Sequence, residues 1–253
     1  MTATISRERV APSSSAARRR AALIAGVAYA VMFVLAIGAN FGALAQIVVP
    51  DDPATTVANI AEHESAFRLG MAAFAVIAVL DIVIAWALHV LLRDLAPNRS
   101  LLAAWFRLAY GAIFAVAVGF MYVALVLATD PERFAGLDAG GREALAGLSM
   151  VGFDTIWHLA LAVFGLHLIM IASIIVPARV APRALGVVLA LAGAAYIADT
   201  FARIVPPDYA AVADIMLVVV ALPSMIGEMW FAGWLLLRAS RSLAAKAPTP
   251  EAA

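Results

Sequence analysis

The sequence predicts an all-α protein, a polytopic membrane bundle of about six transmembrane helices. Three observations lead to this fold class: the composition, the lengths of the apolar stretches and the distribution of arginine. Of the 253 residues, 65% are hydrophobic and 13% are charged, whereas soluble domains are about half apolar and about a quarter charged. A water-soluble chain of this length could not bury so much apolar surface, so we expect the lipid bilayer to solvate it.

Six apolar stretches are long enough to cross a bilayer as helices, which requires roughly 20 residues each. Most are bounded by proline, and an open β-sheet would leave backbone groups without partners in lipid. The predicted spans are residues 21–48, 68–92, 101–128, 151–176, 184–205 and 211–237.

The segments between and beyond the spans give the rest of the organisation. Asp52-Pro53 has the pattern of a helix start, so residues 54–66 are expected to form a helix along the membrane surface, and 139–149 a weaker one. Residues 1–19 and 241–253 are rich in Ser, Ala and Pro, and we expect disordered cytoplasmic tails there. Residues 20–240 then form one transmembrane domain.

The distribution of basic residues predicts the orientation. With the N-terminus inside, twelve basic residues lie in cytoplasmic segments and four outside, which is the asymmetry of the positive-inside rule. Both termini are therefore expected in the cytoplasm. The cytoplasmic set is Arg7, Arg9, Arg18, Arg19, Arg20, Arg93, Arg99, Arg179, Arg183, Arg238, Arg241 and Lys246, and the outer set is Arg68, Arg133, Arg142 and Arg203.

Residues 18–45 also allow a second interpretation, a cleaved signal peptide ending at Ala43-Leu44-Ala45. The apolar run before that triplet is longer than the core of a signal peptide, so we favour a retained first helix. Arginine outnumbers lysine sixteen to one and alanine is abundant, as in proteins of GC-rich bacteria. The predicted location is the bacterial cytoplasmic (inner) membrane, as a multi-pass protein.

Short motifs occur in order along residues 20–240, and together they resemble a known family. They are Phe67-Arg68-Leu69-Gly70, Phe106-Arg107-Leu108, Phe164-Gly165-Leu166-His167-Leu168, Pro182-Arg183-Ala184-Leu185-Gly186, Gly193-Ala194-Ala195-Tyr196-Ile197-Ala198-Asp199, Gly227-Glu228-Met229-Trp230 and Trp234-Leu235-Leu236. The chain resembles an uncharacterised family of bacterial integral membrane proteins, domain of unknown function 4386. Ala172 and Ala239 stand where the resemblance leads us to expect glycine, which bears on local helix packing. The resemblance implies an architecture but no activity.

Ionisable side chains inside a span are costly and usually have partners or a role. Asp81, Arg107 and Glu228 lie at compatible depths in the second, third and sixth predicted spans. We predict that Arg107 pairs with Glu228, Asp81 or both, and we call the three residues the inner polar cluster. A structural ion pair is favoured, and a proton or ion site is the alternative. His167 is expected to be a hydrogen-bonded interhelical residue.

A second set of polar residues lies toward the predicted outside. Asp154 and His158 are four residues apart and therefore share a helix face. In the next span, Tyr196, Asp199 and Arg203 follow one another at spacings of three and four and also share a face. We call this set the outer polar cluster: Arg68, Asp154, His158, Tyr196, Asp199, Arg203 and Asp214. It could bind a small polar solute, or consist of paired helix ends. A metal held by Asp154, His158 and Asp199 is the least favoured alternative, because no tight ligand spacing is present.

Function is not fixed by these patterns. The charges balance and no basic patch is evident, which argues against nucleic-acid binding; no cysteine is present, which excludes disulfides and thiolate sites. We favour a non-enzymatic protein that handles or senses a small solute or ion. A membrane scaffold with structural ion pairs, including one that forms homo-oligomers, is the second interpretation. A membrane-embedded enzyme using Asp154, His158 and Asp199 is the third, and no cofactor is indicated.

Overall fold

The computed structural model describes residues 14–244, and in this range the chain is helical between short turns. Six helices are long and apolar enough to cross a membrane, so the protein is a multi-pass membrane protein by helix length and hydropathy, as predicted. They are Ser15–Ile47 (α1, a short π-helix and α2), Glu64–Leu92 (α4), Pro97–Thr129 (α5), Ala139–Ala178 (α6), Arg183–Ile204 (α7) and Ala213–Leu237 (α8).

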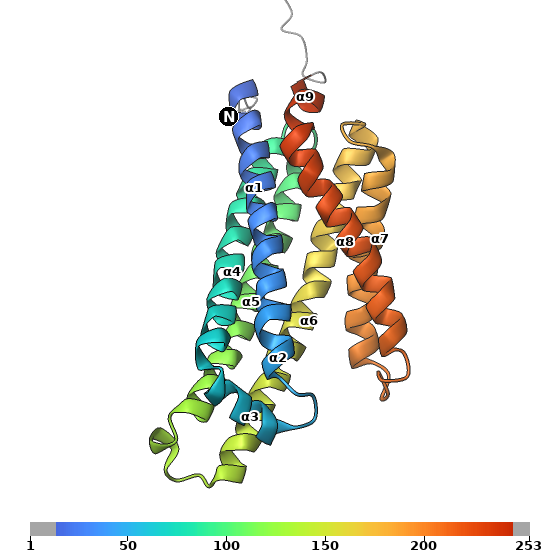
Figure 1. Ribbon diagram of the computed structural model, residues 1–253. Helices are drawn as coiled ribbons and strands as arrows, with labels where there is room; N and C mark the ends of the chain where they lie inside the picture. The colour runs from blue at the N-terminus through green and yellow to red at the C-terminus, as the bar shows by residue number, and fades with distance from the viewer. Residues whose placement is uncertain (1–13, 245–253) are drawn as a thin grey trace, which may run out of the picture.

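The helices extend somewhat into the predicted tails. Residues 15–19 lie in α1 (Ser15–Ala39), and residues 241–244 lie in α9 (Ala239–Ala244). The remaining parts of the two predicted tails, 1–13 and 245–253, are outside the described residues. The start of α1 and α9 lie at the same end of the bundle, as an even number of spans requires (Figure 1).

A helix is present where one was predicted at 54–66, as α3 (Pro53–Glu62) with the expected cap at its start, but residues 64–66 already belong to α4. The Asp52 carboxylate accepts hydrogen bonds from the hydroxyl of Thr55 at 2.6 Å and from its backbone N–H at 3.0 Å. These bonds, the hydroxyl bond first, hold the pKa of Asp52 below its usual value. Pro53 occupies the first turn, where its missing N–H costs nothing.

The prediction of a second surface helix at 139–149 is wrong, because these residues are the first turns of α6. At 1.5 Å per residue the helix is about 60 Å long, roughly twice the hydrocarbon thickness of a bilayer. Its first turns therefore extend past the membrane core and pack against α3. Gly147 permits this contact, since a Cβ there would lie 2.8 Å from the Pro53 ring.

The helices are arranged as a compact group with a two-helix arm. Contacts are most extensive between α5 and α6, α6 and α7, α1 and α4, and α4 and α5. α8 packs on α7 and meets α1 mainly toward the α9 end; toward the other end it diverges from α1 (Figure 1). A short π-helix, Asn40–Leu44, widens the turn of the first span on the side of this divergence.

Glycine allows the closest helix contact, between α6 and α7. A Cβ added to Gly165 would press on the backbone carbonyl oxygen of Gly193, and the reverse is also true. Membrane helices use such small residues to bring their backbones together, since lipid offers no hydrophobic gain for association. This contact fixes α7, and through it α8, against the rest of the bundle.

Replacing Gly165 with Ala is expected to lower the free energy of unfolding by about 1–3 kcal/mol, because the opposing atom is backbone and cannot rotate away. The measurement is unfolding of the purified protein in mixed micelles by titration with dodecyl sulfate. Gly119→Ala is the matched control: nothing lies within 4 Å of a Cβ there, so its stability should change by less than about 1 kcal/mol. Equal effects of the two substitutions would contradict the proposed packing.

Candidate intramembrane binding site

Arg107 is fully buried on α5 and pairs with Asp81 on α4. Its Nη2 lies 2.8 Å from Asp81 Oδ1, and neither side chain is exposed at all. One of the two predicted partners of Arg107 is thereby confirmed. Gly111, one turn along α5, leaves room for the carboxylate, since a Cβ there would lie 3.2 Å from the Asp81 Cβ.

The other contacts of Arg107 come from α1 and α6. Its Nη1 donates to the hydroxyl of Tyr29 and approaches His167 Nε2 at 3.3 Å. His167 Nδ1 lies 2.8 Å from the Ala103 carbonyl oxygen, which can only accept, so Nδ1 carries the proton and Nε2 is the acceptor for Arg107. The guanidinium also lies over the rings of Tyr29 and Phe164, at 4.6 and 5.2 Å. Arg107 thus joins four helices.

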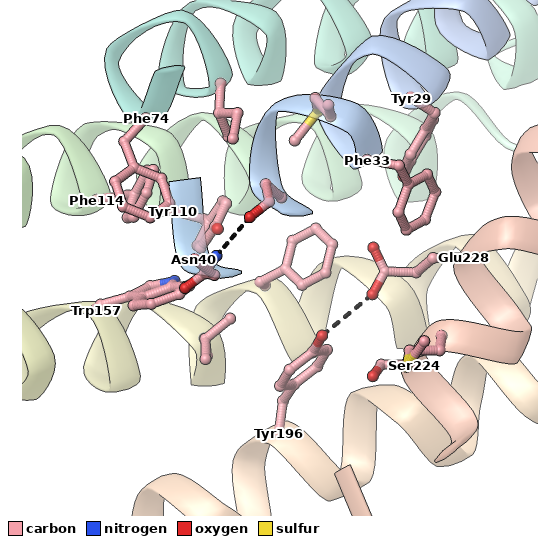
Figure 2. A pocket seen from close by; sticks show the side chains of 16 residues that line it. Tyr29, Phe33, Asn40, Phe74, Tyr110, Phe114, Trp157, Tyr196, Ser224 and Glu228 are labelled. Carbon is pink, nitrogen blue, oxygen red and sulfur yellow. Dashed lines mark hydrogen bonds between the residues drawn. The ribbon is translucent and has the colours of Figure 1, made fainter. Parts of the chain in front are cut away.

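Glu228, the third member of the inner polar cluster, is not part of this ion pair. Its carboxylate accepts a hydrogen bond from the Tyr196 hydroxyl at 3.2 Å, between α8 and α7 (Figure 2). Tyr196 was grouped with the outer polar cluster by its spacing from Asp199 and Arg203, but its hydroxyl points to Glu228 instead. Ser224, one turn before Glu228, faces the same space, and its own hydroxyl donates to the Val220 carbonyl.

These residues border a cavity of about 210 Å³ inside the span. Half of the lining residues are aromatic, and Glu228 is the one carboxylate among the described residues that line it. No Arg, Lys or His of the described chain lines it. The indole Nε1–H of Trp157 is buried on this wall without a well-aligned acceptor in the described residues. The lining residues are Tyr29, Met32, Phe33, Ala36, Asn40, Phe74, Ile77, Tyr110, Phe114, Trp157, Leu161, Phe164, Tyr196, Ser224, Met225 and Glu228.

Beside the cavity is a groove of about 740 Å³ between α1, α6 and α8. Its wall is apolar except for Asn40, Asp154 and Ser224. Exposed apolar side chains such as Phe41 and Met229 stand along it. The Asn40 amide donates to the Ala36 carbonyl at 2.9 Å, one turn earlier in α1. The groove occupies the part of the molecule where α8 diverges from α1 (Figure 1).

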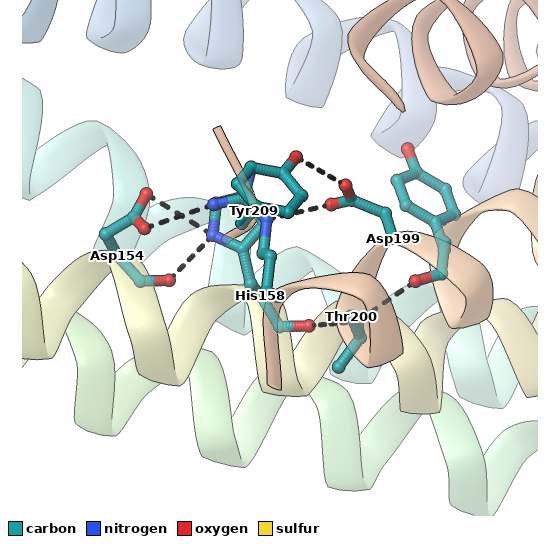
Figure 3. Close-up of polar contacts among 7 residues, drawn as sticks. Asp154, His158, Asp199, Thr200 and Tyr209 are labelled. Atoms are coloured by element: carbon teal, nitrogen blue, oxygen red, sulfur yellow. Dashed lines mark hydrogen bonds and ion pairs between the residues drawn. The ribbon is translucent and has the colours of Figure 1, made fainter. Parts of the chain in front are cut away.

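Most of the outer polar cluster forms a network between α6 and α7. His158 Nδ1 lies 2.8 Å from the backbone oxygen of Asp154 and 3.3 Å from its carboxylate. Arg203 pairs with two carboxylates, at 3.6 Å from Asp154 and 3.0 Å from Asp199. Both acids are labelled in Figure 3. A pocket of about 220 Å³ adjoins this network.

Two members of this network were missed by sequence reasoning. The hydroxyl of Tyr209 donates to Asp199 at 2.6 Å, and burial, followed by this bond, raises the pKa of Tyr209 to about 12. The hydroxyl of Thr200 donates to the His158 carbonyl at 2.7 Å and ties α7 to α6. The position of Tyr209 just after Pro206-Pro207 was the available signal, because two prolines turn the chain back toward the end of α7.

The remaining predicted members lie elsewhere. Arg68 pairs with Glu64 of its own helix at 2.6 Å, and both side chains are exposed. Asp214 is exposed in the first turn of α8. Among the described residues there is no group of three His, Asp or Glu side chains that could hold a metal ion. The cation between Asp154 and Asp199 is Arg203.

Comparisons with known proteins identify a family but bring no activity. The family described as "Domain of unknown function (DUF4386)" matches residues 24–239. An "Uncharacterized protein" of Archaeoglobus fulgidus is 27% identical over 174 residues, which is 69% of this chain and 85% of the relative. No solved structure matches the chain.

Breaking the buried ion pair from either side is expected to cost about 3–5 kcal/mol of stability, because the remaining charge is left uncompensated. We expect Asp81→Asn and Arg107→Met each to show this loss in a dodecyl sulfate titration. The double variant should lose less than the sum of the two. Arg68→Met, which breaks an exposed pair, is the control and should cost about 1 kcal/mol or less. Additive losses in the double variant would mean that the two charges do not interact.

Proposed function

The chain belongs to the family of domain of unknown function 4386, and we propose that it binds and handles a small solute inside the membrane without catalysing a reaction. The observation that carries this proposal is the cavity of about 210 Å³ beside Glu228. Engineered protein cavities of about 150 Å³ already admit benzene, so this space accommodates a small organic group. Its wall is mostly apolar with a few polar groups, which is the usual make-up of a small-molecule site.

The polar groups on the cavity wall favour a cavity that holds a bound molecule over an empty one. The Trp157 N–H interacts with the Tyr110 hydroxyl without forming a well-aligned hydrogen bond, so it keeps the capacity to donate to an occupant. The Glu228 carboxylate faces the cavity with no basic residue on the described wall. An occupant with polar atoms, or water held with it, satisfies both groups.

The other two polar sets fit structural roles better. Arg107 is fully buried, contacts Asp81, Tyr29 and His167, and is not among the residues that line the cavity. Arg203 pairs with both Asp154 and Asp199 at the end of α7. We therefore assign the binding role to the cavity at Glu228 and a packing role to these two sets.

We also propose that both termini are cytoplasmic and that the protein resides in the bacterial cytoplasmic membrane. The α4–α5 turn, with Arg93 and Arg99, and the α6–α7 turn, with Arg179 and Arg183, are at the same end of the bundle as the start of α1 (Figure 1). Basic residues concentrate on the cytoplasmic side of membrane proteins, which supports this orientation.

The orientation predicts opposite behaviour of two reporter fusions in a bacterial host. Green fluorescent protein fused after Ala253 should fluoresce and alkaline phosphatase fused there should be inactive, because fluorescence requires folding inside the cell and phosphatase requires export. Fusions of the truncated chain after Leu137, in the α5–α6 loop, should behave the other way. The reverse pattern at both positions would overturn the proposed orientation.

An accessible cavity predicts that a buried cysteine placed on its wall will react. The chain has no cysteine, so single-cysteine variants need no further change. Ser224→Cys lines the cavity and should be labelled by N-ethylmaleimide in nanodiscs, because reaction requires a thiolate in contact with water. Ala117→Cys is the matched control, fully buried away from the cavity, and should react at least tenfold more slowly. Equal protection of both cysteines would support a dry, scaffold-like interior and contradict solute binding.

A further inference from the structure

We propose that the occupant of the cavity is a cationic amphiphile, with its ammonium group at Glu228 and its hydrocarbon chain in the groove between α1, α6 and α8. This inference rests on the proposed function and names the class of solute. It depends on three features: the continuity of the two hollows, the apolar wall of the groove and the charge inside the cavity.

The cavity and the groove are one connected space. Six residues line both, and they come from all three helices that border the groove. The shared residues are Phe33, Ala36, Asn40, Trp157, Ser224 and Met225. A molecule in the groove can therefore reach the space beside Glu228 without crossing a packed layer of the protein.

The groove opens sideways within the span. Its outer wall carries Ile37, Phe41 and Met229, whose side chains are 59%, 69% and 59% exposed, at positions that lie in lipid if the helix spans a bilayer. The groove volume of about 740 Å³ is within the range of about 300–1,000 Å³ typical of ligand sites. Met150, Met225 and Met229 line it, and flexible methionine side chains adapt to chains of varied shape. The chemistry of this wall suits an alkyl chain entering from the bilayer.

The charge inside the cavity selects the head group. Arg107 is neutralised by Asp81, and no basic residue of the described chain lines the cavity. Glu228 therefore faces the occupant as an acid without a cationic partner on that wall. A cationic group on the occupant compensates its charge, whereas a carboxylate or phosphate there would be repelled.

The aromatic wall adds a second reason for a cation. Tyr29, Phe33 and Tyr196 surround the space in front of the Glu228 carboxylate, and Tyr110 and Trp157 lie further along it (Figure 2). Aromatic faces attract ammonium groups, and walls of this kind recognise quaternary ammonium ligands. A carboxylate beside aromatic side chains, at the end of an apolar groove, matches an ammonium head joined to a hydrocarbon chain.

The test uses the purified protein in nanodiscs of zwitterionic lipid and three twelve-carbon probes: dodecyltrimethylammonium, dodecanol and laurate. Binding is measured by isothermal titration, with the signal of protein-free nanodiscs subtracted. We expect the ammonium probe to bind at least tenfold more tightly than dodecanol, and laurate most weakly. This comparison uses the unaltered protein, so it does not depend on whether a variant folds.

Two pairs of variants then test where the ammonium head group and the hydrocarbon chain of the probe bind. Glu228→Gln should weaken ammonium binding at least tenfold, and Asp214→Asn, which removes an exposed carboxylate from the same helix, should leave it unchanged. Ala221→Trp should obstruct the groove and weaken binding of the dodecyl probe. Val219→Trp, on the exposed face of α8 away from both hollows, is its control.

The outcomes separate this inference from the proposed function. Equal or tighter binding of dodecanol or laurate, or an ammonium affinity unchanged by Glu228→Gln, would overturn the cationic head group while leaving a solute cavity. Labelling of Ser224→Cys without binding of any probe would overturn the amphiphile and keep solute handling. Protection of Ser224→Cys together with no binding would overturn both.

Discussion

The burial of the Arg107 guanidinium is the constraint on which the rest of the structure depends. A charged group at the centre of a span costs about 2.5–3.5 kcal/mol on insertion scales, so its surroundings must supply compensating groups. Asp81 comes from α4, Tyr29 from α1 and His167 from α6, so these helices must meet α5 at one height. Gly111 makes room for the Asp81 carboxylate, and the Phe164 ring covers the cation. The relative heights of α1, α4, α5 and α6 in the bundle are therefore determined by their contacts with the Arg107 guanidinium.

This constraint also explains where the hollow space lies. The contacts of Arg107 are on α1, α4 and α6, whereas α7 is held to α6 by the Gly165–Gly193 contact and α8 is held mainly by α7 and α1. Pro223 removes one backbone hydrogen bond from α8 at the height of the cavity. The cavity and the groove form at the seam between the four helices joined by Arg107 and the α7–α8 pair. A site placed at such a seam can change its width by a small movement of the pair, without breaking the ion pair.

The sequence was sufficient for the spans and for part of the inner polar cluster. Hydropathy and breakers locate a helix along the chain, and depth can be counted in residues, so the pairing of Arg107 with Asp81 could be predicted. Depth says nothing about the rotation of a helix or its neighbours, and for that reason Glu228 was an equal candidate partner. The cavity depends on the rotation of six helices about their axes and could not be predicted. Tyr196 shows a related limit: it shares a helix face with Asp199, but lies about 4.5 Å deeper, at the height of Glu228. Arg68 pairs with Glu64, one turn away on its own helix. The outer polar cluster was assembled from residues at similar depth, and that criterion did not include pairs within one helix.

A carboxylate that faces a cavity inside a span requires a reason, because neutral Gln would have similar size and cost less to insert. A purely structural glutamate would be expected to have a cationic partner, as Asp81 has Arg107, or to lie at a wet helix end, as Asp214 does. Glu228 forms no ion pair among the described residues: Arg107 is near enough to act on it electrostatically but pairs with Asp81, and the direct contact of Glu228 is the neutral hydroxyl of Tyr196. Two things can neutralise it there, a proton or a cation that enters the cavity, and both compete for the same oxygens. Where the carboxyl group carries a proton, a cation that binds displaces it, and occupancy of this site is then coupled to proton release. That coupling follows from the placement of one acid, and it distinguishes this cavity from a packing defect in a passive bundle.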